Sequence, residues 1–256
     1  LDMIKIIISI IIVILSLSTI IYNQNYSTVK ISNKVSIRFM ESSNSIFIGS
    51  DIKVKKVGIF ATATKSSTQN IAMNEVGREA IRKDKNFMDG DYLNHNVKPK
   101  NGLKTARMLG HITYSSEDIM DQKFGRKFQD IKSKIEGTVD YEVENYLQYK
   151  GEKFSDTFDA NSYILMTKAM DGYDASFSSN GSLEEVMKRI KAKLLVVGFD
   201  SDWLYPPKRS KEIQLAAMNV DVQCSCVILK GEQGHDSFLF ASDRYVKIIK
   251  GFLDSK

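Results

Sequence analysis

An aspartate and a histidine, each placed just after a short apolar run, constrain this chain more than any other feature. Asp202 follows the run 194–199, and His235 follows the run 220–229 within Gly-His-Asp-Ser-Phe. Apolar runs of this length, without alternation, are typical of parallel strands that are buried on both faces. We therefore expect both polar residues to lie just past the carboxyl ends of strands, on the side of an α/β sheet that binds ligands.

This order of residues favours a particular chemistry. An aspartate after one strand and a histidine after the next are the last two members of an acyl-transfer triad whose chain order is Ser, Asp, His. The histidine acts as general base, and the carboxylate fixes its tautomer and stabilises the imidazolium. Asp200 is a rival carboxylate, but Asp202 lies further out along the loop. The plainer alternative is a turn aspartate and a surface histidine, without a catalytic role.

The nucleophile that should precede this pair is not found. A nucleophilic serine stands on a strained strand-to-helix turn that requires small residues, as in Gly-x-Ser-x-Gly. No serine of residues 30–50 has glycines at that spacing, and Ser182 follows Asn-Gly at a helix start. Cys224 and Cys226 belong to the strand before the histidine and offer no substitute. The chain as given is therefore expected to be inactive.

The pattern around these motifs predicts an α/β fold. A strand is expected at 57–62, a helix from Ser182 to about residue 191, a helix of about 208–218, and a last helix from near Ser242. Alternating strands and helices predict the carboxyl half of a doubly wound, mostly parallel sheet. We assign 54–67 and 179–256 to this core, and the long helical pattern of 68–178 to an inserted lid.

Candidate substrate-binding residues lie in the insertion and beside the histidine. Arg107 and Tyr114 are two helical turns apart and share a face, with His111 between them. An arginine on that face could bind a substrate carboxylate with two hydrogen bonds, although the stripe could also merely solvate the helix. Asp236 could accept a hydrogen bond from a substrate ammonium, or only stabilise its own loop.

Composition narrows the function classes. The chain has 256 residues and a net charge of +5, from 36 basic and 31 acidic residues without a run of one sign. Nucleic acid is therefore not an expected partner. Cys224 and Cys226 lie on one face of a strand, which favours free thiols in a reducing compartment such as the cytoplasm. The three histidines lack metal-ligand spacing, so no metal site is expected.

The amino end, residues 1–53, is an atypical leader. Residues 4–22 are almost all Ile, Leu, Val, Ser and Thr, a length that suits a membrane span or an uncleaved signal anchor. Alternatively, the region at the amino end is not native, because an Ile-, Asn- and Ser-rich stretch is what AT-rich DNA yields in a shifted frame. Residues 23–50 show no strand-helix alternation. A membrane partner is expected only if 4–22 is genuine.

From about Val54 to Phe252 the chain resembles homoserine O-acetyltransferase, an acyltransferase of methionine biosynthesis with the α/β-hydrolase fold. The resemblance is carried by the Asp202 and His235 segments and by residues 70–78, 90–92, 106–114, 143–147, 151–154 and 158–163. It implies a partial α/β-hydrolase fold with a helical lid insertion, and a homodimer formed through that lid. It also implies acyl transfer from acetyl-CoA, a co-substrate, to the homoserine hydroxyl, with no bound cofactor.

The resemblance also implies roles for single residues. Asp202 and His235 correspond to the catalytic pair, whereas Arg107, Tyr114 and Asp236 stand where the family binds homoserine. The family's Gly-Gly-Ser-Met-Gly-Gly elbow has no counterpart, because charged and bulky residues occupy the corresponding stretch here. Two other hypotheses are open: the same fold with succinyl-CoA as donor, and a membrane-anchored, non-catalytic relic in which the lid is a dimerisation module.

Overall fold

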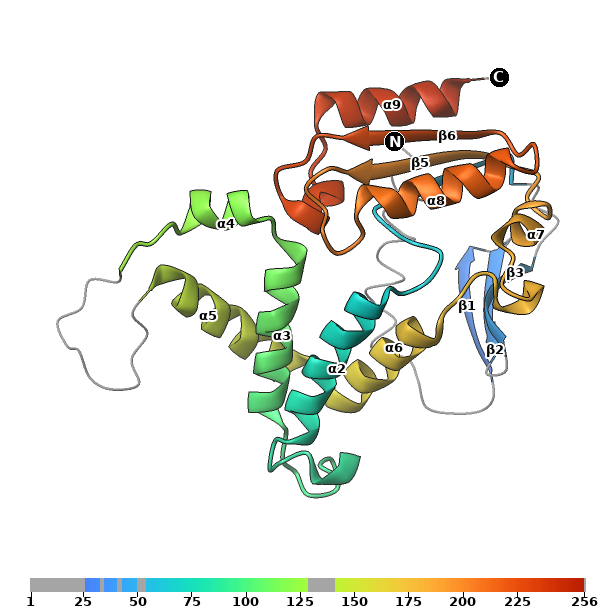
Figure 1. Cartoon of the computed structure of the whole chain (residues 1–256). Coiled ribbons are helices and arrows are strands. Elements are labelled where there is room, and N and C mark those ends of the chain that lie inside the picture. The colour runs from blue at the N-terminus through green and yellow to red at the C-terminus, as the bar shows by residue number, and fades with distance from the viewer. Residues whose placement is uncertain (1–25, 33–34, 41–42, 50–53, 129–140, 256) are drawn as a thin grey trace.

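A three-stranded parallel sheet forms the centre of the carboxyl-terminal core (Figure 1). Its strands are β4 (Lys56–Phe60), β5 (Lys193–Phe199) and β6 (Cys224–Leu229), in the order β4-β5-β6. The predicted strands at 57–62 and 194–199 are confirmed to within two residues. β6 begins later than the predicted residue 220, because 219–222 form a turn after the preceding helix in which Asp221 has a positive φ of 58°.

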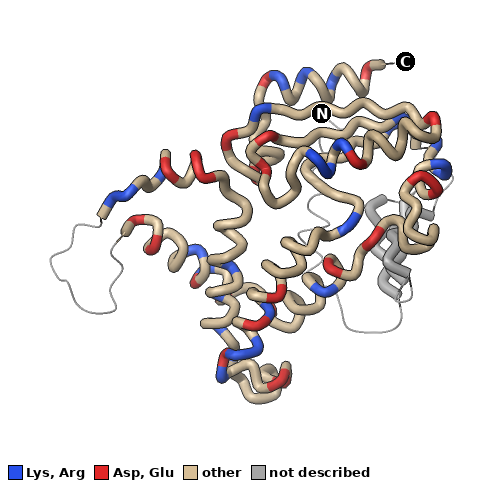
Figure 2. The backbone as a smooth tube through the Cα atoms, viewed as in Figure 1, with Lys and Arg blue, Asp and Glu red and all other residues tan. Residues whose placement is uncertain are grey.

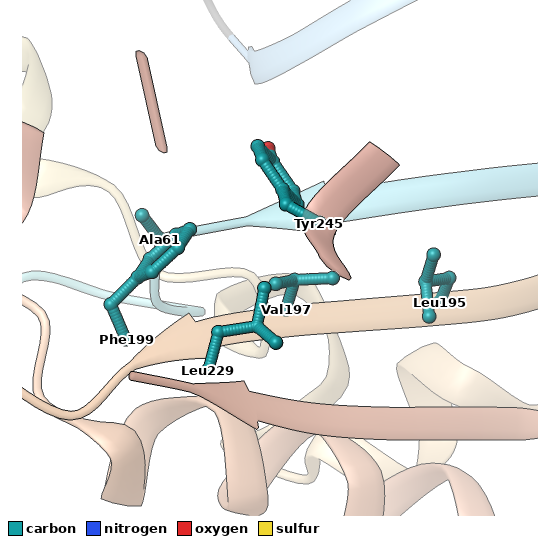
Figure 3. Packing of buried hydrophobic residues seen from close by; sticks show 6 residues of the cluster. All are labelled: Ala61, Leu195, Val197, Phe199, Leu229 and Tyr245. Carbon is teal, nitrogen blue, oxygen red and sulfur yellow. The ribbon is translucent and has the colours of Figure 1, made fainter. Parts of the chain in front are cut away.

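The middle strand is buried on both faces, as its unbroken apolar sequence indicates. Six of the seven residues of β5 are buried. Leu195 and Val197 belong to the cluster that packs against α9 (Asp243–Asp254), and Tyr245 of this helix completes it (Figure 3). Leu194 and Val196 instead pack with residues of α8 (Pro207–Met218). The two helices therefore cover opposite faces of the sheet, as in a doubly wound α/β fold.

The helices of the core start at the predicted residues, but one ends early. The hydroxyl of Ser242 accepts a hydrogen bond from the Tyr245 N–H and begins α9. Ser182 caps α7 (Leu183–Met187) in the same way, by accepting from the Glu185 N–H. The expected continuation of α7 to about residue 191 is wrong. Instead, the N–H of Ile190 donates to the Met187 carbonyl three residues earlier, in a turn that precedes β5.

The structure, a computed structural model, describes residues 54–128 and 141–255, together with the backbone of three strands nearer the amino end. These strands are β1 (Tyr26–Ser32), β2 (Val35–Met40) and β3 (Ser43–Gly49), paired antiparallel in sequence order. The sequence of 23–50 did not predict them. The apolar segment 4–22 lies outside the described residues. In the described part, no helix has both the length and the apolar character to cross a membrane.

Between β4 and β5 the chain forms helices that extend away from the sheet (Figure 1). They are α2 (Thr68–Arg82), η2 (Met88–Gly90), α3 (Lys100–Tyr114), α4 (Glu117–Lys123), α5 (Glu142–Thr157), α6 (Ala160–Gly172) and η3 (Phe177–Ser179). This helical segment has its own apolar core, in which Ile81, Leu103 and Ala160 have no exposed surface. It is thus packed independently of the two clusters that flank the sheet. Its role as a lid stays a prediction.

The charged residues, the cysteines and the possible metal ligands of the described residues bear on the function classes expected from the sequence. Basic and acidic residues are interspersed along the backbone of the described helices (Figure 2). Cys224 and Cys226 are free and partly buried on the α8 side of the sheet, and burial raises the pKa of the Cys224 thiol to about 11. Within 54–128 and 141–255, no group of three or more His, Cys, Asp or Glu side chains is arranged to hold a metal ion.

Two glycines let the backbones of three helices approach closely. A Cβ atom on Gly102 of α3 would lie 2.5 Å from the Cα of Ile81 and 2.6 Å from the Ala80 carbonyl oxygen, both in α2. A Cβ on Gly151 of α5 would lie 2.9 Å from the carbonyl oxygen of Lys104 in α3. Helix α3 is therefore held between α2 and α5, which fixes the direction of the side chains it presents.

We predict that Gly102→Ala destabilises the chain by about 1–3 kcal/mol, because the added methyl group meets backbone rather than a side chain that can move. Urea denaturation followed by circular dichroism would measure this difference. The matched control is Gly251→Ala in α9, where a Cβ has no neighbour within 4 Å. This change should be neutral or stabilise by up to about 1 kcal/mol. Equal midpoints for parent and Gly102→Ala would contradict the proposed close approach.

Candidate active site

Asp202 and His235 meet beyond the carboxyl ends of β5 and β6. The Nδ1 atom of His235 lies 3.0 Å from Oδ2 of Asp202. The strands pair in parallel, so the loops that follow them leave the same edge of the sheet. The carboxylate side chain is completely buried and the imidazole is 16% exposed. The geometry expected of the catalytic pair is present, and its catalytic role stays a prediction.

The second oxygen of Asp202 is also satisfied. Its Oδ1 accepts a hydrogen bond of 2.8 Å from the Tyr205 N–H, and its own N–H donates to the Phe199 carbonyl. A buried carboxylate must be paired in this way, because leaving it without partners costs several kcal/mol. The two contacts also fix the direction of the carboxylate. The remaining oxygen is thereby presented to the imidazole of His235.

The rival carboxylate, Asp200, has a different partner. Its Oδ1 accepts a hydrogen bond of 2.8 Å from the N–H of Gly231, and its own N–H donates to the Leu229 carbonyl. Asp200 thus joins the loop after β5 to the loop after β6. In the structure Asp202, and not Asp200, is the carboxylate that contacts His235, whereas Asp200 brings together the two loops that carry the pair.

The glycine before the histidine is required by close backbone contact. Gly234 begins the 3-10 helix η4 (Gly234–Leu239) with a φ of +71°, and its Cβ would lie 2.5 Å from the Ser116 nitrogen. The Gly234 N–H donates to the Ser201 hydroxyl. The hydroxyl of Ser116 in turn donates to the Glu232 carbonyl. The end of α3 therefore packs directly on the histidine loop, and a side chain at position 234 would separate them.

Two further hydrogen bonds join the helical segment to the loop that carries Asp202. The indole N–H of Trp203 donates to the Ser115 carbonyl at 2.9 Å. The Asn70 amide of α2 donates to the Leu204 carbonyl at 3.2 Å. The helical segment therefore contributes to the position of both loops. Sequence reasoning did not find these contacts, because each joins residues more than 80 positions apart.

Aromatic rings surround the imidazole of His235. The ring centroids of Tyr205, Phe238 and Tyr114 lie 5.2, 5.3 and 5.9 Å from that of the histidine. Burial raises the pKa of both tyrosines, so both stay protonated. Tyr114 was predicted to lie in the site, whereas Tyr205 and Phe238 were missed. Each follows a residue of the catalytic pair by three positions in a loop, where no periodic pattern marks it.

Arg107 points its guanidinium at aromatic rings. Its Cζ lies 5.0 Å from the ring centroid of Phe154 and 5.9 Å from that of Tyr114. In the described part of the chain, no carboxylate lies within salt-bridge distance of it, and its side chain is partly buried. A partly buried guanidinium that stacks on aromatic rings but has no ion-pair partner is suited to bind an anion. This arrangement fits the predicted contact with a substrate carboxylate.

Asp236 is half-buried next to the histidine. Burial raises the pKa of its carboxyl group, and the positive charges of His235, Arg107 and Lys123 oppose this effect. Its carboxylate has no hydrogen-bond partner among the residues that the structure describes. Asp236 and Arg107 thus place one negative and one positive group near His235. A zwitterionic amino acid offers the complementary charges.

His111 does not face the catalytic pair, although it shares a helix face with Arg107 and Tyr114. Its Nδ1 lies 3.4 Å from the hydroxyl of Tyr146 on α5, and the two rings meet edge to face. Burial, followed by the positive charges of Arg107, Lys150 and Lys123, lowers the pKa of His111 to about 4. The imidazole is therefore neutral at physiological pH.

An open cavity of about 500 Å³ lies beside the Asp202 loop. Ser201 and Trp203, which flank Asp202, form part of its lining. The other lining residues are Ile112, Ser115, Ser116, Glu117, Asp118 and Met120, from the end of α3 and the start of α4. The cavity does not include Arg107 or Asp236, so it is distinct from the charged groups around His235.

No protein family model matches the chain. The chain is 45% identical over 201 residues to the homoserine O-succinyltransferase of Marinomonas sp. (strain MWYL1), and 46% identical over 201 residues to that of Acinetobacter baumannii (strain ACICU). In both cases the aligned residues make up 78% of this chain and 52% of the relative. The chain thus spans about half the length of the curated relatives it matches.

A solved structure has a fold similar to that of this chain. The homoserine O-acetyltransferase from Bacillus anthracis superposes with a TM-score of 0.71 at 19% identity, over 79% of this chain and 54% of that chain. At this identity the likeness shows the fold alone. The chain therefore has part of an α/β-hydrolase fold, and its sequence is similar to about half of a homoserine O-succinyltransferase.

Proposed function

We propose that the chain provides the histidine-aspartate pair and the homoserine-binding residues of a homoserine O-acyltransferase of methionine biosynthesis. The proposal rests on one observation above all, the 3.0 Å contact between His235 and Asp202, close to Arg107 and Asp236, which have no ion-pair partner among the described residues. The similarity to homoserine O-succinyltransferases supports it. The nucleophilic serine is not identified in this chain.

The pair has the arrangement of a general base. With the Nδ1 proton of His235 donated to Asp202, Nε2 carries the lone pair that accepts a proton. The imidazole first takes the proton of the serine hydroxyl as this attacks the acyl-CoA thioester, and gives it to the departing CoA thiolate. It then takes the proton of the homoserine hydroxyl, which attacks the acyl-serine, and returns it to the released serine. Such proton transfers typically contribute 10²–10⁴-fold to the rate.

The charged residues near His235 complement the two ends of an amino acid. Arg107 binds the homoserine carboxylate through its guanidinium, which already stacks on Tyr114 and Phe154. Asp236 accepts a hydrogen bond from the ammonium group. Because Asp236 directly follows His235, the bound amino acid lies close to the base that must reach its hydroxyl.

Succinyl-CoA is the favoured acyl donor. The relatives at 45–46% identity are named homoserine O-succinyltransferases, whereas the acetyltransferase structure compared above shares 19% identity. The names of these relatives agree with succinyl-CoA, the alternative donor, rather than with acetyl-CoA, the donor that the sequence first suggested. No described residue is assigned to bind the donor. Both donors therefore belong in any assay.

A homodimer formed through the helical segment, in the cytoplasm, completes the proposal. Its support is the exposed apolar surface of α6, where Met166 and Met170, one helical turn apart, are 39% and 47% exposed. Apolar side chains that gather on a helix face are typical of protein contact surfaces. The segment would then serve both as the lid and as the dimer contact.

The first test concerns the tautomer of His235. We predict that the neutral imidazole carries its proton on Nδ1 and not on Nε2, which ¹⁵N NMR of the imidazole resonances distinguishes. The sequence contains three histidines, so single substitutions assign each signal. In Asp202→Asn the signal of His235 should shift toward a mixture of tautomers, because the carboxylate that holds the Nδ1 proton is gone. An unchanged signal would show that Asp202 does not set the tautomer.

The second test concerns homoserine. We predict that the purified chain binds L-homoserine, and that Arg107→Gln weakens binding by at least about tenfold, because a charge-assisted bidentate contact is lost. NMR titration of the His235 signal would measure both affinities. Arg209→Gln is the control, since Arg209 lies on α8 and pairs with Glu212. Equal loss in both variants, or no loss in either, would argue against Arg107 as the carboxylate ligand.

The third test concerns acyl transfer. The chain alone should form no O-acylhomoserine from homoserine and either acyl-CoA, because it lacks an identified nucleophile. Mixed with the part of the Marinomonas protein that it does not cover, it should form O-succinylhomoserine, detected by mass spectrometry. His235→Ala in this chain should abolish the product. Product formed equally with His235→Ala would rule out the assigned base.

A further inference from the structure

The two residues that flank Asp202 each contact a different part of the molecule. On one side, the Ser201 hydroxyl accepts a hydrogen bond of 3.2 Å from the Gly234 N–H, in the loop after β6. On the other side, the indole N–H of Trp203 donates to the Ser115 carbonyl at 2.9 Å, directly after the last residue of α3. The loop of Asp202 is therefore joined both to the histidine loop and to the helical segment.

The residue after Ser115 contacts the histidine loop as well. The Ser116 hydroxyl donates to the Glu232 carbonyl, and a Cβ atom on Gly234 would lie 2.5 Å from the Ser116 nitrogen. The dipeptide 115–116 is thus contacted from two sides, by Trp203 of the loop after β5 and by the loop after β6. It is the place where α3 is attached to both loops that carry the catalytic pair.

Other contacts join these two loops without the participation of α3. Oδ1 of Asp200 accepts a hydrogen bond from the Gly231 N–H, and Nδ1 of His235 lies 3.0 Å from Oδ2 of Asp202. The geometry within the pair therefore does not depend on the Trp203 contact. What this contact fixes is the position of the two joined loops relative to α3.

The proposed homoserine site extends across the same junction. Arg107, the proposed ligand of the carboxylate, lies on α3, whereas Asp236, the proposed ligand of the ammonium group, lies in the loop after β6. A ligand that contacts both residues benefits from a fixed spacing between them, because any freedom left in the site has to be lost on binding. A ligand that contacts only one of them gains nothing from that spacing.

We propose that Trp203 is a positioning residue, which sets the spacing between Arg107 and Asp236 by joining the loop after β5 to the end of α3. The inference rests on the proposed function and adds a reason why the site prefers an amino acid to a ligand with a carboxylate alone. Trp203 acts through the backbone of Ser115, and its role requires no contact with the substrate. Because the loops after β5 and β6 are joined, holding one of them on α3 also holds the other.

Binding of two ligands to the purified chain tests the proposal. L-homoserine offers a carboxylate and an ammonium group, whereas 4-hydroxybutyrate is the same molecule without the amino group. Trp203→Phe keeps an aromatic ring and loses the N–H that donates to Ser115. It should weaken homoserine binding about fivefold, as expected for the loss of one neutral hydrogen bond, and change 4-hydroxybutyrate binding by less than about twofold. NMR titration of the His235 signal would measure the affinities.

Thr105→Val is the control. It also removes one hydrogen bond from a side chain to a carbonyl, but this bond joins Thr105 to Asn101 within α3. The control variant should bind both ligands like the parent. Thermal melting followed by circular dichroism would show that both variants are folded. The Trp203 side chain lines an open cavity, so the smaller ring of phenylalanine leaves no enclosed void.

The parent chain allows a second measurement, for which no variant is required. Trp203 is the single tryptophan of the sequence, so the exchange of one indole N–H with deuterium reports how often its contact with Ser115 opens. Coupling between two events is reciprocal, so saturating homoserine should slow this exchange about fivefold, the factor by which the contact strengthens homoserine binding. Saturating 4-hydroxybutyrate should leave the exchange unchanged. A role of Trp203 in stability alone would not produce this difference between the ligands.

The outcomes that would overturn the assignment are distinguishable. Equal homoserine affinity in parent and Trp203→Phe, or indole exchange that homoserine does not slow, would refute the role of Trp203 and leave the proposed function standing. An equal loss of affinity for both ligands would show a structural role only. Absence of homoserine binding to the folded parent chain would refute the proposed function itself, and the role of Trp203 with it.

Discussion

The buried carboxylate of Asp202 is the constraint on which the candidate site depends. A charge without exposed surface has to be met by hydrogen bonds from fixed directions. The Tyr205 N–H supplies one and the imidazole of His235 the other. Satisfying the carboxylate therefore also orients the histidine. The loop after β5 carries Asp202 and the loop after β6 carries His235. Asp200 joins these loops a second time, by accepting a hydrogen bond from the Gly231 N–H.

The helical segment completes the site rather than merely covering it. Gly234 permits the end of α3 to touch the histidine loop, and Trp203 and Asn70 join the segment to the loop of Asp202. Close packing of α3 between α2 and α5 then fixes the position of Arg107 on α3. A substrate site built from a core and an inserted segment lets the same catalytic pair be combined with different ligands.

Similarity of fold and similarity of sequence support the proposed substrate to different degrees. The α/β-hydrolase architecture accommodates many reactions, so its presence alone does not select an acyl acceptor. Arg107 and Asp236 near His235 suit a zwitterionic amino acid in general. The proposal of homoserine among such ligands rests on relatives at 45–46% identity, of whose length this chain covers about half. They leave the acyl donor to be decided by experiment.

The sequence by itself determined the strands, the helix caps and the proximity of Asp202 and His235, because neighbouring parallel strands end at one edge of a sheet. From the sequence we did not predict β1 to β3, although Val35, Ile37 and Phe39 alternate with polar residues in β2, and we did not predict the early end of α7. Only the tertiary structure showed that Asp200 accepts from the Gly231 N–H, that His111 contacts Tyr146, and that Tyr205 and Phe238 lie against the imidazole. These outcomes depend on contacts between distant segments, whose directions are set by packing and not by local periodicity.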